Sequence, residues 1–272
     1  MSGLAMGYLT LGDLDPFEMV TAAGAGGFRA SGIRLTGHRP GDAWPFDPAD
    51  PADIERMQGV MLAAGIQLVN ACTYRVTVEI DPAAYAPVLA ACHALGIGTL
   101  ICNSFATEDA AIVEKLAAIA DLAAPLGIRL ALEFIPVSAV KTVSQAARIA
   151  EATGRSNVGL VIDALHLWRS GGSPEDVRAI PSSRLYAVQL CDGPLEAPVG
   201  EALYAEMRGG RLMPGHGAFD LAGLLRALPD GVEVEVEVPN VADAHLPPAE
   251  RAASAWRQTE AFLSALRAEA VQ

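Results

Sequence analysis

Four polar residues stand at or near the ends of four consecutive apolar segments in the second half of the chain. Glu133 closes IRLALE, Asp163 closes VGLVID, and Gln189 and Glu237 lie in YAVQLC and VEVEVEV. Three carboxylates held close together repel one another and have raised pKa values unless a cation lies among them. Oxygen ligands suit Mn²⁺, Mg²⁺ or Co²⁺ better than a metal that prefers thiolates. If these segments are neighbouring strands, the pattern predicts a metal site formed by the four residues together.

A histidine stands three residues after one of these acids. The segment VGLVIDALHLWRSGG (158–172) places His166 between two leucines, three positions beyond Asp163. An imidazole at this spacing could face whatever the metal holds. The alternative is a core histidine with satisfied ring nitrogens. Taken singly, a glutamate at a strand end is usually solvated or ion-paired, and Gln189 is the weakest ligand, so the prediction depends on the four residues as a group.

Short apolar segments alternate with alanine-rich helical segments along the chain. The expected strands cover residues 4–9, 28–35, 66–72, 97–103, 128–134, 158–163, 184–191 and 232–238. The expected helices lie near 16–25, 51–64, 82–95, 107–125, 142–152, 174–179, 218–228 and 248–268. Four of these helices begin with an N-cap residue followed by proline at the first helical position, at Asp15-Pro16, Asp50-Pro51, Asp81-Pro82 and Ser173-Pro174.

Eight strand–helix units in 272 residues predict a single-domain (β/α)₈ TIM barrel of the α/β class over residues 1–272. A doubly wound open sheet is the main alternative, but GYLTLGDLD after the first strand contains no GxGxxG phosphate turn. Two long loops, 36–50 and 192–217, follow strands. They would therefore lie on the barrel face that carries chemistry.

Composition excludes several classes of function. The net charge is −13 with only 19 scattered Lys and Arg residues, so the chain lacks the basic stripe that nucleic acids require. No apolar segment approaches the roughly 18 residues needed to span a bilayer. The four cysteines, Cys72, Cys92, Cys102 and Cys191, show no zinc spacing, and MSGLAMGYLTLGDLDP shows no secretory signal. We therefore expect a cytoplasmic protein with reduced thiols.

Five segments resemble the xylose isomerase-like barrel superfamily, often called the sugar phosphate isomerase/epimerase family. They are ALEF (131–134), VGLVIDALHLWRSGG (158–172), YAVQLCDGP (186–194), RLMPGHG (211–217) and VEVEVPN (234–240). The resemblance implies one divalent metal ion held by Glu133, Asp163, Gln189 and Glu237, with Mn²⁺ expected first and Mg²⁺, Co²⁺ or Zn²⁺ as alternatives. Most relatives have histidine at the position of Gln189, and the branch of bacterial 3-dehydroshikimate dehydratases resembles this chain in having glutamine.

The resemblance also implies roles around the metal. His166 matches the family's Asp-x-x-His pattern and is expected to contact the substrate or donate a proton, with Glu133 and Glu237 as proton carriers. Arg211 resembles a family arginine that reaches an oxyanion or phosphate, and Arg208 is an equal candidate by position. His216 departs from the usual PGEG motif. The expected substrate-binding residues are Arg211, Arg208, His216, Arg34, Asn70 and Asn103, with His38 as a further candidate, and the alternative for most of them is a structural role.

A metal that binds a carbonyl and a neighbouring hydroxyl acidifies the α-proton by stabilising an enediolate. We therefore expect an isomerase or epimerase of a hydroxy-ketone derived from a sugar or polyol. The alternative is a lyase of the 3-dehydroshikimate or keto-inositol dehydratase type, which Gln189 favours. An abasic-site endonuclease, another member type of the superfamily, conflicts with the charge of −13, and a non-catalytic barrel subunit remains an alternative. The resemblance also implies a homodimer.

The alternation in GVEVEVEV places Glu233, Glu235 and Glu237 on the inner face of a barrel strand. Buried glutamates need partners. Arg129 stands four residues before Glu133, as Glu233 stands four before Glu237, so we predict an Arg129–Glu233 ion pair in the lower barrel. The pattern assigns no partner to Glu235.

Overall fold

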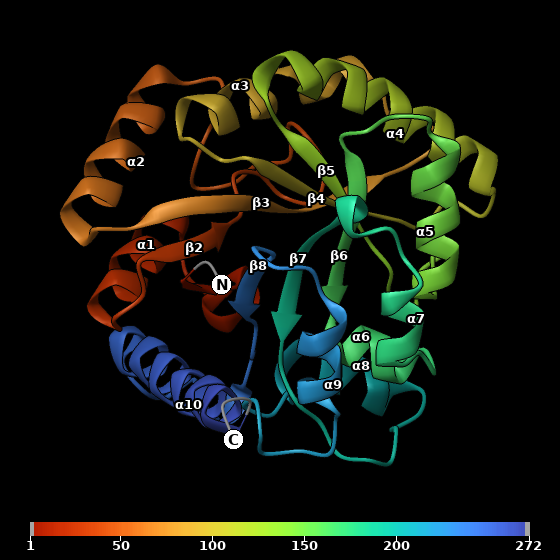
Figure 1. The fold of residues 1–272 in the computed structure, drawn as a ribbon. Helices are drawn as coiled ribbons and strands as arrows, with labels where there is room; N and C mark the ends of the chain where they lie inside the picture. Colours follow the sequence, from red (N-terminus) through yellow and green to blue (C-terminus); the bar gives the residue numbers. More distant parts are fainter. Residues whose placement is uncertain (1–2, 270–272) are drawn as a thin grey trace.

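Eight parallel strands close into a barrel in chain order in the computed structural model, which describes residues 3–269 (Figure 1). The strands are β1 (Leu4–Met6), β2 (Ala30–Ile33), β3 (Gln67–Val76), β4 (Thr99–Ser104), β5 (Arg129–Glu133), β6 (Val158–Asp163), β7 (Leu185–Leu190) and β8 (Glu233–Val236). Strand β1 pairs with both β2 and β8, which leaves no open edge. The predicted (β/α)₈ barrel is confirmed, and the open doubly wound sheet is excluded.

The described residues form ten α-helices, and α10 packs beside α1 in the outer ring (Figure 1). They are α1 (Pro16–Ala25), α2 (Pro51–Ala64), α3 (Ala86–Ala94), α4 (Asp109–Ala123), α5 (Val143–Ala152), α6 (Ala164–Arg169), α7 (Pro174–Arg178), α8 (Glu201–Gly209), α9 (Leu221–Ala227) and α10 (Pro248–Glu269). Among the described residues, no helix is both long and apolar enough to cross a membrane.

The helix starts predicted from Asp-Pro and Ser-Pro pairs are confirmed. Asp15 accepts hydrogen bonds from the backbone N–H of Phe17 at 2.8 Å and of Glu18 at 2.9 Å, and α1 begins at Pro16. Helices α2 and α7 likewise begin at their prolines, while Pro82 begins a short 3₁₀ helix that leads into α3. Each such cap satisfies otherwise unpaired backbone donors and contributes about 1 kcal/mol.

Three expected boundaries are wrong. The first strand ends at Met6 rather than at residue 9, because Tyr8–Leu11 forms a 3₁₀ helix. Strand β3 extends to Val76, past the expected end at residue 72, because Tyr74 and Val76 pair with β4 and are buried. The expected loop 192–217 contains the amphipathic helix α8, whereas residues 36–50 form a loop without helix or strand, as predicted.

Strand β8 shows how the alternation positions its side chains. The Val234 side chain faces helices α9 and α10 on the outside of the barrel. The Glu235 side chain points into the barrel and contacts residues of β3 and β7. Glu235 and Glu237 are buried, as predicted from the alternation. The barrel interior below the strand ends is therefore partly polar. The four cysteines are buried and free.

Candidate metal centre

Two carboxylates and an imidazole meet at the C-terminal end of the barrel. Glu133 is the last residue of β5, and Asp163 is the last residue of β6. His166 Nε2 lies 3.7 Å from Glu133 Oε1 and 4.0 Å from Asp163 Oδ2. One potential ligand atom from each of the three residues lies within 4.8 Å of the others, and all three residues are buried. This is the arrangement expected where parallel strands end side by side.

The spacing between Asp163 and His166 follows from a helix cap. Asp163 is the N-cap of α6, and its Oδ1 accepts a hydrogen bond from the backbone N–H of His166 at 3.0 Å. The cap fixes the first turn of α6 and so places the imidazole beside the carboxylates. Burial lowers the pKa of His166 to about 4. The negative charge of Asp163 raises this pKa, whereas the positive charge of Arg211 lowers it further. The ring is therefore neutral at pH 7, and its buried Nδ1 has no hydrogen-bond partner.

Arg211 bridges two of the predicted ligands. Its Nη1 donates to Asp163 Oδ2 at 2.7 Å and lies 3.5 Å from Glu237 Oε2. The other oxygen of Glu237 accepts from the backbone N–H of Leu9 at 3.2 Å. A Cβ added to Gly7 would lie 2.7 Å from the Cβ of Glu237, so glycine provides the space for this side chain. Arg211, expected as a substrate contact, is buried and also holds the carboxylates in place.

Gln189, the remaining predicted ligand, lies on β7 as the register partner of Asp163. Its Nε2 donates to Glu235 Oε2 at 3.1 Å, while its buried Oε1 has no hydrogen-bond partner. A buried amide oxygen without a partner is costly, and a bound cation would satisfy it. The Glu133 carboxyl has a similar need, because burial, together with the charges of Asp163 and Glu237, raises its pKa to about 8.

The charges of the cluster also fit a divalent cation. Glu133, Asp163 and Glu237 carry three negative charges when ionised, and Arg211 supplies one positive charge. A divalent ion would balance the remaining two, and carboxylate and amide oxygens are ligands for such ions. The charge and chemistry of these donors therefore fit one divalent metal ion.

A cavity of about 80 Å³ lies over these groups, and its lining includes Glu133, His166, Arg211 and Glu237. The expected substrate contacts Arg34, Asn103 and Arg208, and the further candidate His38, also line it.

Part of the cavity lining is cationic. The Arg34 guanidinium lies over the rings of Tyr8, at 4.6 Å, and Trp44, at 5.6 Å. The pKa of His38 is lowered mainly by burial, and further by the positive charges of Arg34 and Arg75. The cavity lining thus combines the carboxylates, where the metal is expected, with cationic side chains.

The structure does not bring two of the expected substrate contacts, Asn70 and His216, into this cavity. Asn70 lies inside the barrel, because β3 continues six residues beyond it instead of ending nearby. There Asn70 Nδ2 donates to Glu233 Oε1 at 2.9 Å and also to Glu235 Oε1. His216 is exposed in the turn after Arg211 and does not line the cavity.

The cavity also has a support that the sequence analysis did not identify. Arg169, in the last turn of α6, forms a two-point ion pair with Glu206 of α8, with N–O distances of 2.8 Å and 2.6 Å. Both side chains are buried, and Arg208 follows on the same helix. The pair fixes α8 over the end of the barrel. The amphipathic pattern of EALYAEMRG was the available signal for this helix.

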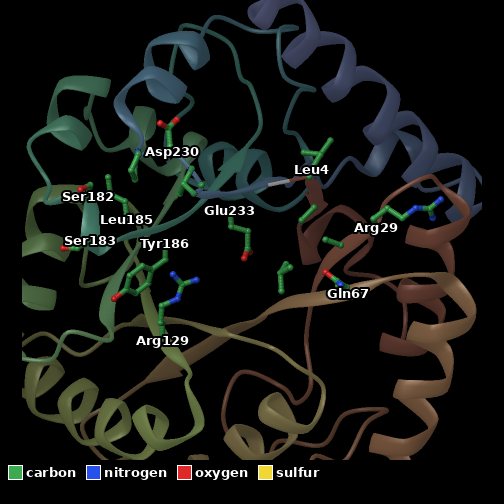
Figure 2. Close-up of a pocket in the computed structure, with 17 residues that line it drawn as sticks. Leu4, Arg29, Gln67, Arg129, Ser182, Ser183, Leu185, Tyr186, Asp230 and Glu233 are labelled. Atoms are coloured by element: carbon green, nitrogen blue, oxygen red, sulfur yellow. The ribbon is translucent and has the colours of Figure 1, made fainter. Parts of the chain in front are cut away.

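The predicted Arg129–Glu233 ion pair is wrong, although both side chains line one cavity at the opposite end of the barrel (Figure 2). Arg129 donates to Thr99 Oγ1 at 3.1 Å, and its guanidinium lies 4.5 Å from the centre of the Tyr186 ring. Glu233 instead accepts from Asn70. The aromatic face of Tyr186 takes the position beside Arg129, as Figure 2 shows, and only a longer-range attraction to Glu233 remains.

A closed barrel with a cluster of buried carboxylates and an imidazole at its strand ends defines the class of this protein. Residues 20–263 match the family model described as Xylose isomerase-like TIM barrel. The chain belongs to this family, as the resemblance of its motifs predicted.

Curated relatives have two kinds of name. An inosose isomerase from Bacillus licheniformis is 32% identical over 149 residues, which are 51% of this chain and 52% of the relative. A 3-dehydroshikimate dehydratase from Pseudomonas aeruginosa is 31% identical over 131 residues, which are 46% of this chain and 20% of the relative. The match thus spans about half the length of the isomerase.

A solved structure supports the fold over nearly the whole chain. The crystal structure of the IOLI protein with a bound zinc atom superimposes with a TM-score of 0.79 at 20% identity, and the match covers 97% of this chain and 98% of that chain. At this identity the likeness shows the shared fold.

Proposed function

We propose that this chain is a metal-dependent isomerase or epimerase of a hydroxy-ketone derived from a sugar or cyclic polyol. The observation that carries the proposal is the buried cluster of Glu133, Asp163 and His166 at the C-terminal end of the barrel. Arg211 joins Glu237 to this cluster, and Gln189, the register partner of Asp163, has a partnerless amide oxygen. The inosose isomerase name of a relative, and the zinc atom in the IOLI structure, support the same class.

Glu133, Asp163, Gln189 and Glu237 would hold one divalent ion, with Mn²⁺ as the first candidate. When bound, such an ion supplies Lewis-acid polarisation of a substrate carbonyl. The carboxyl of Glu133, whose pKa is raised to about 8 without a cation, and that of Glu237 are placed to carry a proton between neighbouring carbon atoms. The neutral imidazole of His166 can donate a hydrogen bond to a substrate oxygen or take up its proton.

The test is turnover before and after removal of metal. Purified protein is assayed with keto-sugars and with inosose, then treated with a chelator and supplied again with Mn²⁺. We expect activity to disappear on chelation and to return with the ion. Turnover that is unaffected by complete metal removal would contradict the proposal.

A dehydratase is the second candidate, and two observations favour it. Gln189 stands where most relatives have histidine, and the cavity wall formed by Arg34 and Arg208 suits a substrate carboxylate. In this reaction a proton leaves the carbon beside the carbonyl, and the hydroxyl on the next carbon departs as water after it is protonated. The dehydratase name of a relative supports the same reaction class.

The variant Arg208→Met separates the two candidates. If the substrate carries a carboxylate, removal of the cation should raise KM strongly for 3-dehydroshikimate. If the substrate is a neutral inosose, KM should change little. The KM values of the wild-type protein for both substrates serve as the reference. The substrate that the wild type prefers shows which of the two reactions it catalyses.

We further propose that the protein acts in the cytoplasm as a homodimer. The buried free thiols suit a reducing compartment, and the family resemblance implies self-association. Sedimentation of the purified chain tests the oligomeric state, and a monomer at micromolar concentration would contradict it.

A further inference from the structure

Glu235 is fully buried inside the barrel, below the predicted metal ligands, and the proposed reaction does not use it. Its Oε2 accepts the Nε2–H of Gln189 at 3.1 Å, and its Oε1 accepts from Asn70 Nδ2. Gln189 and Glu235 are register partners on β7 and β8, so the strand ladder itself sets this contact. Glu235 thus joins the glutamine of the metal centre to the opposite side of the barrel.

The contact determines which way the Gln189 amide faces. An amide has an oxygen that can bind a metal and a nitrogen that cannot, and the two ends have nearly the same shape. With Nε2 bonded to Glu235, the other end of the amide is the partnerless Oε1. A carboxyl oxygen can accept this bond in either protonation state. Without an acceptor below it, the amide could rotate and turn its nitrogen toward the cation.

The barrel leaves space for this arrangement on the side of β2. A Cβ added to Gly32 would lie 2.6 Å from Asn70 Oδ1 and 3.2 Å from Glu235 Oε1. Asn70 is held in turn by its bond to Glu233 at 2.9 Å. Glu235 is therefore fixed from two sides, and a fixed acceptor can orient the amide that it binds.

We propose that Glu235 is a positioning residue of the metal centre, which holds the Gln189 amide with its oxygen toward the ion. This inference rests on the metal site of the proposed function. Groups that orient metal ligands in this way commonly affect metal affinity by about 10–100-fold. This role also explains why Glu235 is a buried acid, for which the sequence pattern alone predicts no partner.

The test is titration of Mn²⁺ into the chelator-treated full chain, followed by calorimetry. Glu235→Met has a similar length but no acceptor, and we expect it to weaken Mn²⁺ binding about 10–100-fold. Glu235→Gln keeps an acceptor oxygen without the charge, and we expect an affinity near that of the wild type. Glu233→Gln is the matched control, because it keeps the acceptor oxygen for Asn70 and Glu233 does not bond to Gln189. It should bind Mn²⁺ as the wild type does.

A double-mutant cycle shows whether Glu235 acts through the glutamine. In a Gln189→Ala background, Glu235→Met should cause no further loss of Mn²⁺ affinity, because the amide that it orients is gone. An equal loss in both backgrounds would overturn the proposal. So would an unchanged Mn²⁺ affinity in a folded Glu235→Met protein.

A structure of the Mn²⁺-loaded wild-type protein tests the inference without any variant. We expect Gln189 Oε1 at the ion and Nε2 on Glu235, and a Gln189 side chain turned away from the ion would overturn the proposal even if Glu235→Met does not fold. The outcomes also separate the two proposals. A wild-type protein that binds no Mn²⁺ removes the metal centre and this role together, whereas equal binding by the wild type and Glu235→Met removes only the role of Glu235.

Discussion

At the C-terminal end of the barrel, His166 lines a cavity of about 80 Å³, and its buried Nδ1 has no hydrogen-bond partner. The Oε1 of Gln189, on the neighbouring strand β7, is also buried without a partner. At the N-terminal end, Glu233 and Arg129 line a larger cavity of about 610 Å³, and each has a protein partner (Figure 2). The larger cavity is therefore not the better candidate site. Buried polar atoms are mostly satisfied in folded proteins. The smaller cavity is favoured because two partnerless atoms there belong to His166, in a cluster of buried carboxylates, and to Gln189, the register partner of Asp163.

The strongest test of this difference compares one glutamate from each end. Glu133→Gln should lower kcat/KM by about 10²–10⁴-fold, because it removes both a proton carrier and a metal ligand. Glu233→Gln should leave kcat/KM unchanged. Steady-state assays of both variants, on the substrate that the wild type prefers, make the comparison. A loss of equal size in Glu233→Gln would show that the two ends are not functionally distinct.

A second comparison uses one arginine from each end. Arg211→Met should lower the free energy of unfolding of the metal-free protein by about 3–5 kcal/mol, because it leaves Asp163 and Glu237 buried without their cation. Arg129 is exposed, so Arg129→Met should cost about 1 kcal/mol or less. Urea unfolding measures both. Similar costs for the two variants would contradict the buried role of Arg211.

Two glycines near the ends of β1 give a third comparison. Gly7→Ala places a Cβ 2.7 Å from Glu237 Cβ, and overpacking of this kind costs about 1–3 kcal/mol. It should also weaken Mn²⁺ binding, because Glu237 must move. A Cβ at Gly3 would meet nothing within 4 Å, so Gly3→Ala should change stability by less than about 0.5 kcal/mol. Thermal unfolding and Mn²⁺ titration of both variants check this; unaltered Mn²⁺ binding by Gly7→Ala would argue against Glu237 as a ligand.

The smallest effect is expected for His216. This side chain is exposed and does not line the cavity, so His216→Ala should leave kcat and KM within about twofold of the wild type. Arg208→Ala, which alters the cavity wall, serves as the positive control and should raise KM for an anionic substrate. A large loss of activity in His216→Ala would place the turn after Arg211 in the active site after all.

The fold could be predicted because its signals are local. Asp15-Pro16 caps a helix through bonds to residues two and three places away, and such pairs determine helix starts without help from the rest of the chain. The closeness of Glu133 and Asp163 was predictable for a related reason. Parallel strands end on one face, so Glu133 and Asp163 had to lie near each other once the barrel was assumed.

Other features of the site depend on register and on contacts distant in sequence. Asn70 was expected in the cavity, but β3 runs on to Val76 and leaves it inside the barrel. Arg129 was expected to pair with Glu233, but the Tyr186 ring lies beside its guanidinium. Glu235 could be placed on the inner face by alternation, yet its bond to Gln189 depends on the pairing of β7 with β8. No local pattern encodes these contacts.

The most direct test of the metal centre is a crystal structure of the Mn²⁺-soaked protein with anomalous diffraction recorded at the manganese edge. We expect one strong peak at the C-terminal end of the barrel, within bonding distance of oxygen atoms from Glu133, Asp163, Gln189 and Glu237. A peak held by Glu133, Asp163 and His166, with Gln189 and Glu237 unbound, would contradict the ligand set. A peak only in the cavity beside Glu233 would contradict the whole account.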